Sequence, residues 1–466
     1  MIAKIIDGTN TALYSYILII LLVLGGIYFT LRTRFAQFRL LGQQFKSVME
    51  KSDKNSVSSF QALMVSTASR VGTGNIIGVA TALCVGGFGS VFWMWVIALI
   101  GAASAFVEST LAQIYKKRGS DGCYGGPAYY IQAAMKKRWL AVVFSVFLIL
   151  TYGVGFNMLA SYNLQSTFSA YSFYDKGYTP WIIGFVIAAL VGYCLIGGGK
   201  RIVSVTTFIV PIMGAVYILV AIVLSLINIK VLPQVFREIF QGAFDLKAIF
   251  GGFGGSCVMY GIKRGLFSNE AGVGSAPNAS ASAQVSHPAK QGLVQVLSVF
   301  IDTILVCSAT AFMCMSSGIT PPQDSDLAAT YVQQSLSVTL GQAGPIFITV
   351  AMVFFAFTTL LGNLFYVDKT INYLAGREPS KTVRNVYYVI ASLVIFVGAG
   401  LSADLLWGIA DILMGGMTLI NMPVIIYLGK YAIRALKDYE RQLKSGKEIT
   451  FRAQDIDLPH ETDYWN

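Results

Sequence analysis

Long apolar segments recur along the whole sequence, and they constrain the fold more than any other feature. Residues 12–31, 89–114, 203–229 and 343–367 are largely uncharged, and each is long enough for a helix to cross the hydrocarbon core of a bilayer, which takes roughly 20 residues. Transmembrane β-strands are shorter and alternate in hydropathy. Only 12% of the 466 residues are charged, about half of the share in a typical soluble domain. The sequence therefore predicts an all-α polytopic membrane protein.

The pattern divides into eleven predicted spans, one of which is interrupted. Lys and Arg concentrate on the cytoplasmic side of membrane proteins. If the N-terminus lies outside, the inner segments hold 26 Lys and Arg and the outer segments hold five. We therefore expect a multi-pass protein of the cell membrane (plasma or inner membrane), with its N-terminus outside and its C-terminus in the cytoplasm. The predicted spans are 12–31, 58–84, 89–114, 140–166, 180–197, 203–229, 246–285 (interrupted), 290–317, 343–371, 385–401 and 404–429.

The rest of the composition excludes other classes of protein. The net charge of +11 comes from basic residues in the loops between apolar spans, so we do not expect nucleic acid as a partner. The six cysteines are scattered without a CxxC pair, and there are two histidines. Isolated buried cysteines usually act as small apolar residues, so neither a disulfide framework nor a metal-binding cluster is expected. The polar tail after about residue 436 is expected to be solvated.

Two segments share an uncommon pattern that suggests an internal repeat. Residues 70–80 (RVGTGNIIGVA) and 264–274 (RGLFSNEAGVG) both read R-x-x-x-x-N-x-x-G-V-small, at an offset of 194 positions. A chance match among glycine-rich helices is the alternative. The same offset matches the later spans of the two halves in order. Because each unit has five spans, the second enters the membrane from the opposite side, and such inverted repeats are typical of secondary transporters.

The repeat also divides the chain into parts. The predicted parts are 1–57 (an N-terminal span and a basic cytoplasmic loop), 58–229 (the first five-helix repeat), 246–429 (the second, inverted repeat) and 436–466 (a cytoplasmic polar tail).

Both repeated segments are poor helix formers and predict breaks in their spans. Residues 71–78 hold three glycines and residues 251–265 hold six, and glycine inside a helix costs roughly 1 kcal/mol relative to alanine. Broken helices persist at membrane depth where the backbone is buried in protein or lines a watery cavity. Close helix packing through small residues is the alternative, and it suits 251–255 best.

Free amides at a helix break form an anion site, and unwound carbonyls hold a cation, so two breaks together suit an α-amino acid. We expect the amides of Thr73 and Gly74 to bind the carboxylate, with Asn75 orienting it. Carbonyls between Gly265 and Asn269 are expected to bind the ammonium group, with Phe267 in the pocket wall. No acidic residue in the first break selects a cationic side chain, so a neutral substrate is favoured.

Sodium needs oxygen ligands, as other hard cations do. Thr358 and Thr359 place two hydroxyls in an aromatic run of span nine. The alternative is that each hydroxyl bonds a carbonyl of its own helix. The repeat offset maps Thr358 and Thr359 onto Leu164 and Gln165 of span four. Spans four and nine are therefore both candidates to face the centre of the helix bundle.

Ionisable residues inside spans are functional candidates by default. The candidates here are Arg70, Glu108, Arg264, Glu270 and Asp302. We expect the two arginines to face some of the three acids, either as gates or as structural ion pairs. Asp411 is expected to lie at an outer gate.

Longer motifs resemble the sodium:alanine/glycine symporter family over about residues 10–440. The most specific is the string 264–277 (RGLFSNEAGVGSAP); the others are 69–78 (SRVGTGNIIG), 125–130 (GGPAYY), and 291–292 (QG) with 300–303 (FIDT). The resemblance implies one extra N-terminal helix before a five-plus-five inverted repeat of the LeuT type, with two broken helices. It also implies one sodium ion coupled to alanine or glycine. The implied sodium ligands are the carbonyls of Ala68, Val71 and Phe355 and the hydroxyls of Thr358 and Thr359.

One departure from the family pattern concerns the substrate site. Members commonly carry Asn-x-x-Gln-x-Asn in span four, whereas here Asn157 is followed by Ala160 and Tyr162 at the two later positions. The polar side chain near the substrate is then missing, or it is replaced by Tyr162, Asn163 or Gln165. The candidate substrate contacts are Gly72, Thr73, Gly74, Asn75, Tyr162, Gln165, Gly265, Phe267, Ser268 and Asn269.

These features together predict a secondary active transporter, not an enzyme, that imports a small neutral amino acid, alanine or glycine, by sodium symport. A proton-coupled carrier is the nearest alternative, with Glu108, Glu270 or Asp302 as the proton site. A membrane enzyme would need clustered catalytic groups, and a channel usually closes its pore by oligomeric symmetry. The expected partners are the amino acid, Na⁺ as coupling ion and membrane lipid, with no cofactor and no metal other than sodium. The chain is expected to be a monomer.

Overall fold

The computed structural model describes residues 2–53, 56–119, 122–245, 256–376, 379–446, 448–459 and 462–465. Most of them are helical, and η marks a π-helical or 3-10 turn. The first half contains α1 (Ile2–Ala12), η1 (Leu13–Ile17), α2 (Leu18–Arg32), α3 (Ala36–Arg39), α4 (Leu41–Val48), α5 (Ser59–Arg70), η2 (Gly74–Gly78), α6 (Val79–Gly86), α7 (Gly89–Ile114), β1 (Lys117–Gly119), β2 (Gly122–Tyr124), α8 (Pro127–Met135), α9 (Arg138–Leu148), η3 (Ile149–Gly155), α10 (Phe156–Ser166), η4 (Thr167–Ala170), α11 (Thr179–Ile196), α12 (Gly198–Ile227) and α13 (Leu232–Ala243). The second half contains α15 (Cys257–Asn269), α16 (Pro277–Ser280), α17 (Pro288–Val299), η6 (Phe300–Cys307), α18 (Ser308–Met315), η7 (Ser325–Leu327), α19 (Ala328–Leu340), α20 (Ala343–Ala375), α21 (Lys381–Gly398), α22 (Ala403–Ser445) and η8 (Ala453–Ile456).

Most of the predicted spans are present as helices. Within the described residues, nine helices are long and apolar enough to cross a membrane, and the bent pair Ser59–Arg70 with Gly74–Gly86 makes a tenth. The predicted span 89–114 coincides with α7, for example, and 203–229 lies almost entirely within α12. The remaining predicted span, 246–285, begins in residues 246–255, which lie outside the described residues together with the glycines 251–255. Its described helix α15 has 13 residues, so the count of eleven stays a prediction.

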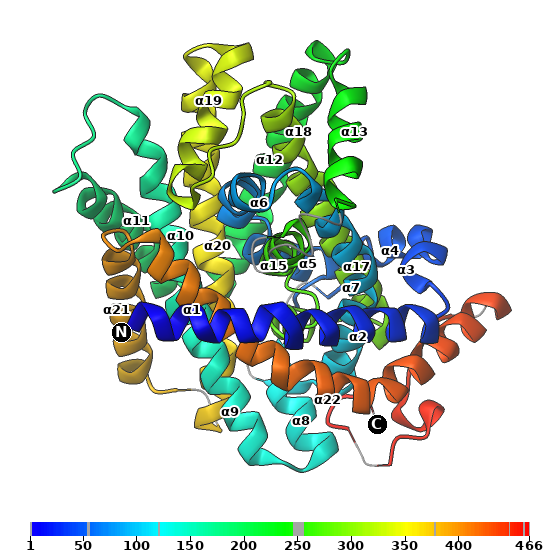
Figure 1. Cartoon of the computed structure of the whole chain (residues 1–466). Coiled ribbons are helices and arrows are strands. Elements are labelled where there is room, and N and C mark those ends of the chain that lie inside the picture. Colours follow the sequence, from blue (N-terminus) through cyan, green and yellow to red (C-terminus); the bar gives the residue numbers. More distant parts are fainter. Residues whose placement is uncertain are drawn as a thin grey trace.

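The two halves begin in a similar way. An interrupted helix opens each half, α5–η2–α6 in the first and α15–α16 in the second, and longer helices follow. Both interrupted helices lie near the middle of the view in Figure 1. Helix α7 packs against α15 and α17, while α12 and α20 pack against α5. The two breaks are therefore enclosed by protein, and the inverted relation between the halves stays a prediction.

Four spans contain a π-helical segment that the sequence analysis did not predict. These are η1 in the N-terminal span, η2 in the first broken span, η3 between α9 and α10, and η6 between α17 and α18. A π-helical turn widens the helix locally and occurs often at functional sites. Two of the four, η2 and η6, contact each other.

The N-terminal span packs on the last one. Figure 1 shows α1 and α2 as one rod that crosses α22. The Tyr14 hydroxyl donates a hydrogen bond to the Asp411 carbonyl at 2.9 Å, and a Cβ at Gly25 would lie 2.2 Å from the Met422 side chain. The extra helix is thus a tightly packed part of the bundle.

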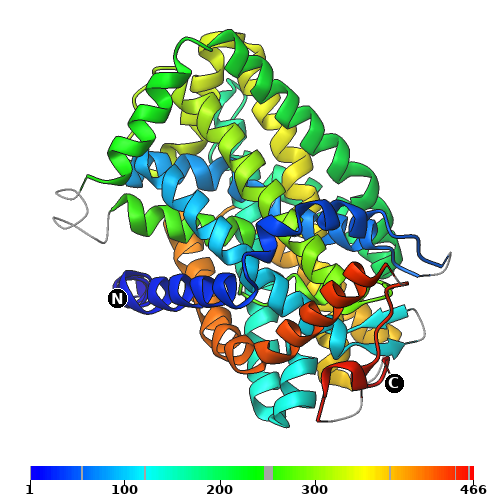
Figure 2. The ribbon, with the colours of Figure 1, turned by 90° about the vertical axis from the view of Figure 1, so that its right-hand side faces the viewer.

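The C-terminal tail differs from its expected solvated state, because it folds back onto the bundle. Figure 2 shows this tail beside the hairpin of β1 and β2. Trp465 is 7% exposed, and its indole Nε1 donates to the Gln113 carbonyl at 2.7 Å. The ammonium group of Lys116 lies 3.9 Å from the Tyr464 ring centre and donates to the Ala283 carbonyl at 3.0 Å. Apolar residues in a short polar segment were too few to give a periodic signal.

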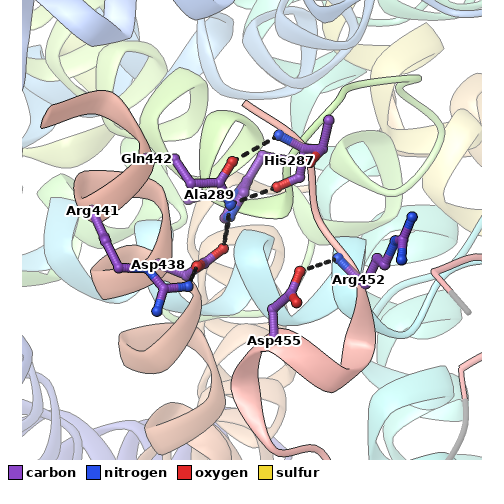
Figure 3. A network of polar contacts seen from close by, with 8 residues as sticks. His287, Ala289, Asp438, Arg441, Gln442, Arg452 and Asp455 are labelled. Carbon is purple, nitrogen blue, oxygen red and sulfur yellow. Dashed lines mark hydrogen bonds and ion pairs between the residues drawn. The ribbon is translucent and has the colours of Figure 1, made fainter. Parts of the chain in front are cut away.

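His287 joins the tail to the start of α17. Its Nε2 lies 3.3 Å from the Asp438 carboxylate, and its Nδ1 accepts a hydrogen bond from the Ala289 amide (Figure 3). Its ring packs edge-on against Phe451 of the tail, with 4.9 Å between ring centres. Burial lowers the pKa of His287 below its usual value, against the opposing effect of Asp438. Burial likewise lowers the pKa of Lys116 to about 8.

Candidate functional site

The first helix break is short and is closed by an asparagine side chain. Helix α5 ends at Arg70 and η2 begins at Gly74, and the two parts of the span meet at 51°. Val71 leaves the helical conformation with φ −77° and ψ 87°. The Asn75 Oδ1 accepts a hydrogen bond from the Gly72 amide at 2.8 Å. The predicted break is confirmed, and η2 begins without a side-chain cap, so its first amides remain available to a ligand.

The second break lies further along the chain than expected. Helix α15 continues through Asn269, and residues 270–276 then separate it from α16. Positive φ angles occur at Glu270 (54°), Gly272 (86°) and Gly274 (93°). The expected break between Gly265 and Asn269 is therefore wrong in position. The reason is that Gly265 serves helix packing: a Cβ there would lie 2.7 Å from the Ile97 side chain of α7.

Glycines bring α20 and α15 against the first break. A Cβ at Gly72 would lie 1.9 Å from the Thr359 hydroxyl oxygen, and one at Gly74 would lie 2.8 Å from the Phe267 ring. A Cβ at Gly362 would lie 2.6 Å from the Ser69 amide nitrogen. Residues from three separate elements therefore meet at one point, because the glycines at these positions allow the close approach.

A small closed cavity lies where these elements meet. Its volume is about 10 Å³, which is about the space that one water molecule needs. Seven of its nine lining residues are among the predicted site residues. The lining consists of Ser69, Arg70, Gly72, Thr73, Gly74, Phe156, Phe267, Glu270 and Thr359.

The threonines of α20 differ in how their hydroxyls are used. Thr358 donates to the carbonyls of Phe354 and Phe355 at 2.9 and 3.2 Å, which is the alternative expected for a threonine inside a helix. The Thr359 hydroxyl is buried, has no hydrogen-bond partner in the part of the chain that the structure describes, and faces Gly72. Buried polar groups are rarely left unsatisfied.

The residues around Thr359 fit a sodium ion. Gly362 holds α20 against Ala68 and Ser69, and Val71 has just left the helix. Phe355 is fully buried one turn before Thr359. Carbonyl and hydroxyl oxygens are the ligands that a hard cation prefers. The hydroxyl of Thr359, without a partner among the described residues, leaves room for such a ligand.

Asp302 gathers a polar cluster beside the cavity. Its Oδ1 accepts from Asn75 Nδ2 at 2.7 Å, and its Oδ2 accepts from the hydroxyls of Ser268 and Thr303 at 2.8 Å each. Asn269 donates to Thr303 at 3.3 Å. Asn75, Ser268 and Asn269 therefore face η6, and they are absent from the cavity lining.

Arg70 and Glu270 both line the cavity. Arg70 donates to Gln295 Oε1 at 2.8 Å, and its Nε and Nη2 have no partner among the described residues. Glu270 accepts hydrogen bonds from Ser69 at 3.0 Å and from Ser275 at 2.7 Å. One carboxylate thus contacts both interrupted helices.

The other predicted ionic contacts are only partly as expected. Glu108 accepts from Asn421 at 2.9 Å and from the Gly272 amide at 3.4 Å, so it holds the second break in place. Arg264 pairs with Asp411 at 3.2 Å, and the expected pairing of Arg264 with Glu108, Glu270 or Asp302 is wrong. The reason is the orientation of the Arg264 side chain. Arg264 lies one turn before the second break, on the side of α15 that faces α22.

Two sets of contacts lie near the interrupted helices. On the α22 side, Asp411 also pairs with Lys263 at 2.7 Å, the Arg264 guanidinium lies 3.8 Å from the Trp407 ring centre, and Trp407 packs on Phe267. Before the start of α5, the Val57 carbonyl accepts from the Gln284 amide at 2.9 Å, and Glu50 pairs with Lys290 at 2.7 Å. The residues that line the cavity are all buried.

Comparison with known proteins shows the family to which the sequence belongs. The sequence matches the profile of the sodium:alanine symporter family over residues 1–453. The chain belongs to this family. It is 41% identical over 463 residues to the amino-acid carrier protein AlsT of Bacillus subtilis, covering 99% of this chain and 97% of AlsT. It is 35% identical over 453 residues to the sodium/alanine symporter AgcS of Methanococcus maripaludis, covering 95% of this chain and 98% of AgcS.

A further relative is named for a different substrate, glutamine. The probable sodium/glutamine symporter GlnT of Bacillus subtilis is 41% identical over 455 residues, which cover 97% of this chain and 93% of GlnT. Members of the sodium:alanine symporter family are transporters, so the chain is a membrane transporter and not an enzyme.

The departure from the pattern of the sodium:alanine symporter family lies on α10. Asn163 donates to the Thr73 hydroxyl at 3.2 Å, so it is the polar residue of α10 that reaches the first break. Gln165 accepts from Tyr174 at 2.8 Å, and neither it nor Tyr162 lines the cavity.

Sequence reasoning missed two lining residues, Ser69 and Phe156. Phe156 stacks on Phe267 with 4.5 Å between ring centres. Ser69 precedes the motif arginine, and its position in the motif was the only signal available for it.

Proposed function

We propose that this chain is a sodium-coupled symporter that imports a small neutral amino acid, alanine or glycine, by alternating access. The unpartnered hydroxyl of Thr359 carries the proposal, because it is buried and faces the first helix break. A sodium ion bound there would join α20 to the break through Thr359 and the carbonyls of Ala68, Val71 and Phe355. Thr358 would contribute when its hydroxyl turns from its own helix.

The cavity supports a small substrate. Two glycines and two phenylalanines line it, namely Gly72, Gly74, Phe156 and Phe267, which agrees with a small apolar side chain on the substrate. The amides of Thr73 and Gly74 at the start of η2 would bind the carboxylate. Carbonyls that follow Asn269 at the second break, rather than those between Gly265 and Asn269, would receive the ammonium group. AlsT is named an amino-acid carrier and AgcS a sodium/alanine symporter, which agrees with this class of substrate.

The cavity must expand before it holds an amino acid, since its present volume is about 10 Å³. With the N-terminus outside, the cluster of Lys263, Arg264 and Asp411 forms the outer gate above Trp407 and Phe267. The pair of Glu50 and Lys290 then belongs to the inner gate. Alternating access would release one of these sets while the other stays formed.

Uptake into reconstituted vesicles tests the proposal. We expect labelled alanine to accumulate under an inward sodium gradient and to be displaced by glycine more strongly than by lysine or glutamate. Accumulation that ignores the sodium gradient and follows a pH gradient would assign the coupling to a proton, with Asp302 or Glu270 as the site. Absence of accumulation of any amino acid under either gradient would disprove symport. A glutamine arm is included because GlnT is named for that substrate.

A further inference from the structure

A second, larger cavity lies away from the helix breaks. It has a volume of about 740 Å³ and lies between the hairpin β1–β2, helix α8, the start of α9 and the end of α20. Sites for small ligands usually have volumes of about 300–1,000 Å³. No residue of the transport site lines this cavity, so it needs an explanation of its own.

Four cationic side chains line this basic cavity, and the described part of its lining contains no Asp or Glu. They are Lys117, Lys136, Arg138 and Lys369. Among the described residues, Lys117, Lys136 and Arg138 form no ion pair, and the carboxylate nearest to Lys369 is that of Asp368, at 3.8 Å. Three cations without an ion pair among the described residues, with Lys369 beside them, attract an anion strongly.

The walls of the basic cavity also supply neutral hydrogen-bonding groups. The rings of Tyr124, Tyr129 and Tyr373 contact one another edge-on, with centres 5.5 and 4.9 Å apart. Gln132 of α8 accepts a hydrogen bond from Tyr373 of α20. These contacts link helices that are far apart in sequence, so the cations project from a packed frame.

The backbone at Lys136 is unusual for a residue with a side chain. Lys136 ends α8 in the left-handed conformation, with φ 55°. Glycine normally occupies this position at a helix end because it has no Cβ. Lysine here places a charge at the mouth of the cavity, and α9 begins two residues later at Arg138.

The basic cavity lies at the end of two predicted membrane spans. Arg138 begins one span and Lys369 lies in the last turns of another. Trp139, next to Arg138, is 65% exposed, and exposed tryptophans at the start of a span are typical of the membrane interface. A ligand that enters here meets the protein at the depth of the lipid phosphates.

We propose that this basic cavity binds the phosphate-bearing headgroup of an anionic phospholipid. Basic pockets between transmembrane helices on the cytoplasmic side have the charge and position that such headgroups require. The phosphate would lie between Lys136, Arg138 and Lys369, and the tyrosines and Gln132 would meet the headgroup hydroxyls. A bound headgroup would then add a link between the end of α20 and helices α8 and α9, beside the contacts of Tyr129, Gln132 and Tyr373.

The test measures binding of a short-chain phosphatidylglycerol to the purified full-length protein in detergent, with short-chain phosphatidylcholine and inorganic phosphate as separate probes. We expect phosphatidylglycerol to raise the thermal unfolding midpoint at physiological salt, whereas the other two probes leave it unchanged. The double variant Lys136→Gln/Arg138→Gln should bind about thirtyfold more weakly, since each charge near the headgroup contributes about fivefold. The matched control is Lys46→Gln/Lys437→Gln, which removes two exposed cations from the same side of the protein and should bind as the wild type does.

Three results would overturn this assignment. An equal shift with inorganic phosphate would make the basic cavity a free-anion site instead of a lipid site. An equal loss of affinity in the control would mean diffuse surface attraction, which salt also screens. Unchanged binding in the double variant would exclude the cavity. Lys369→Gln, tested alone, guards against a folding defect in the double variant and should weaken binding about fivefold.

Discussion

Gly362 offers the sharpest test of the contact between α20 and the first helix break. In the structure, a Cβ at this position would lie 2.6 Å from the Ser69 amide nitrogen and 3.2 Å from the Ala68 carbonyl carbon. Both neighbours are backbone atoms, so no flexible side chain can move aside. The substitution Gly362→Ala must therefore move α20 away from α5.

The size of the movement follows from these distances. Ordinary contacts of a Cβ begin at 3.4 Å, so the two helices must separate by about 0.8 Å next to the Ser69 amide. Forcing extra methyl groups into a packed core costs about 1–3 kcal/mol. If the strain is relieved when the sodium ligands separate, the half-saturating sodium concentration rises by about 5- to 150-fold, because 1.4 kcal/mol is a factor of ten in an equilibrium constant.

The assay is sodium-dependent alanine uptake in vesicles, with the thermal midpoint as a check on folding. Gly214→Ala is the matched control, because Gly214 lies within helix α12 and nothing is within 4 Å of its added Cβ. Alanine is also the better helix former, so this control should keep the wild-type sodium dependence and lose no stability. If Gly362→Ala activates with sodium as the control does, the proposed meeting of α20 and α5 at the ion site is refuted.

Other substitutions test the remaining contacts. Thr359→Ala should raise the half-saturating sodium concentration about tenfold or more, because a hydrogen-bonding group to a charge is worth about 1.5–3 kcal/mol; Thr359→Ser should keep most of the affinity, and equal behaviour of the two variants would remove the hydroxyl from the site. Asp411→Asn leaves two buried cations without their partner and should cost about 3–5 kcal/mol in stability, measured as a lower thermal midpoint, whereas the exposed Asp404→Asn should change it little. Trp465→Ala should weaken docking of the C-terminal tail by about 3–5 kcal/mol. The readout is faster hydrogen exchange of the Ala453 amide, which donates a hydrogen bond to the Trp465 carbonyl. If this amide is as protected in Trp465→Ala as in the control Trp465→Phe, the packing described above is contradicted. Because burial lowers the pKa of His287 from 6.5, the neutral ring is favoured in the folded protein and docking should weaken as the pH falls below 6.5. Asp438 opposes this trend and nearby Lys290 reinforces it; His287→Gln should make exchange of the tail independent of pH in this range.

The sequence was sufficient for most of the helical framework. Long apolar runs such as 89–114 coincide with α7 almost residue by residue, because a helix that crosses a bilayer leaves a signal of about 20 residues. The first break was also predictable, since three glycines within eight residues weaken a helix locally. The second break was displaced because Gly265 is a packing glycine, and composition alone does not distinguish packing from unwinding.

Side-chain partners at the site were less predictable. Arg264 and Asp411 are 147 positions apart, and nothing in the local pattern of either one indicates the other. Asn75 was expected to face the substrate, whereas its amide group bonds Gly72 and Asp302. The orientation of the Asn75 side chain depends on Asp302, which lies in the π-helical segment η6. Such π-helical segments leave no periodic signal in the sequence. The tail escaped prediction because its contacts depend on single residues such as Trp465.

The position of Glu270 has a consequence for how tightly ion flow and substrate flow are linked. Its two oxygens accept hydrogen bonds from Ser69 and Ser275, which lie next to different helix interruptions. When one interruption rearranges, the other therefore loses a buried bond unless it moves as well. A state that frees sodium while retaining the amino acid would leave part of this carboxylate unsatisfied, and such states are costly for a buried group. We therefore expect Glu270 to limit the leakage of sodium without substrate.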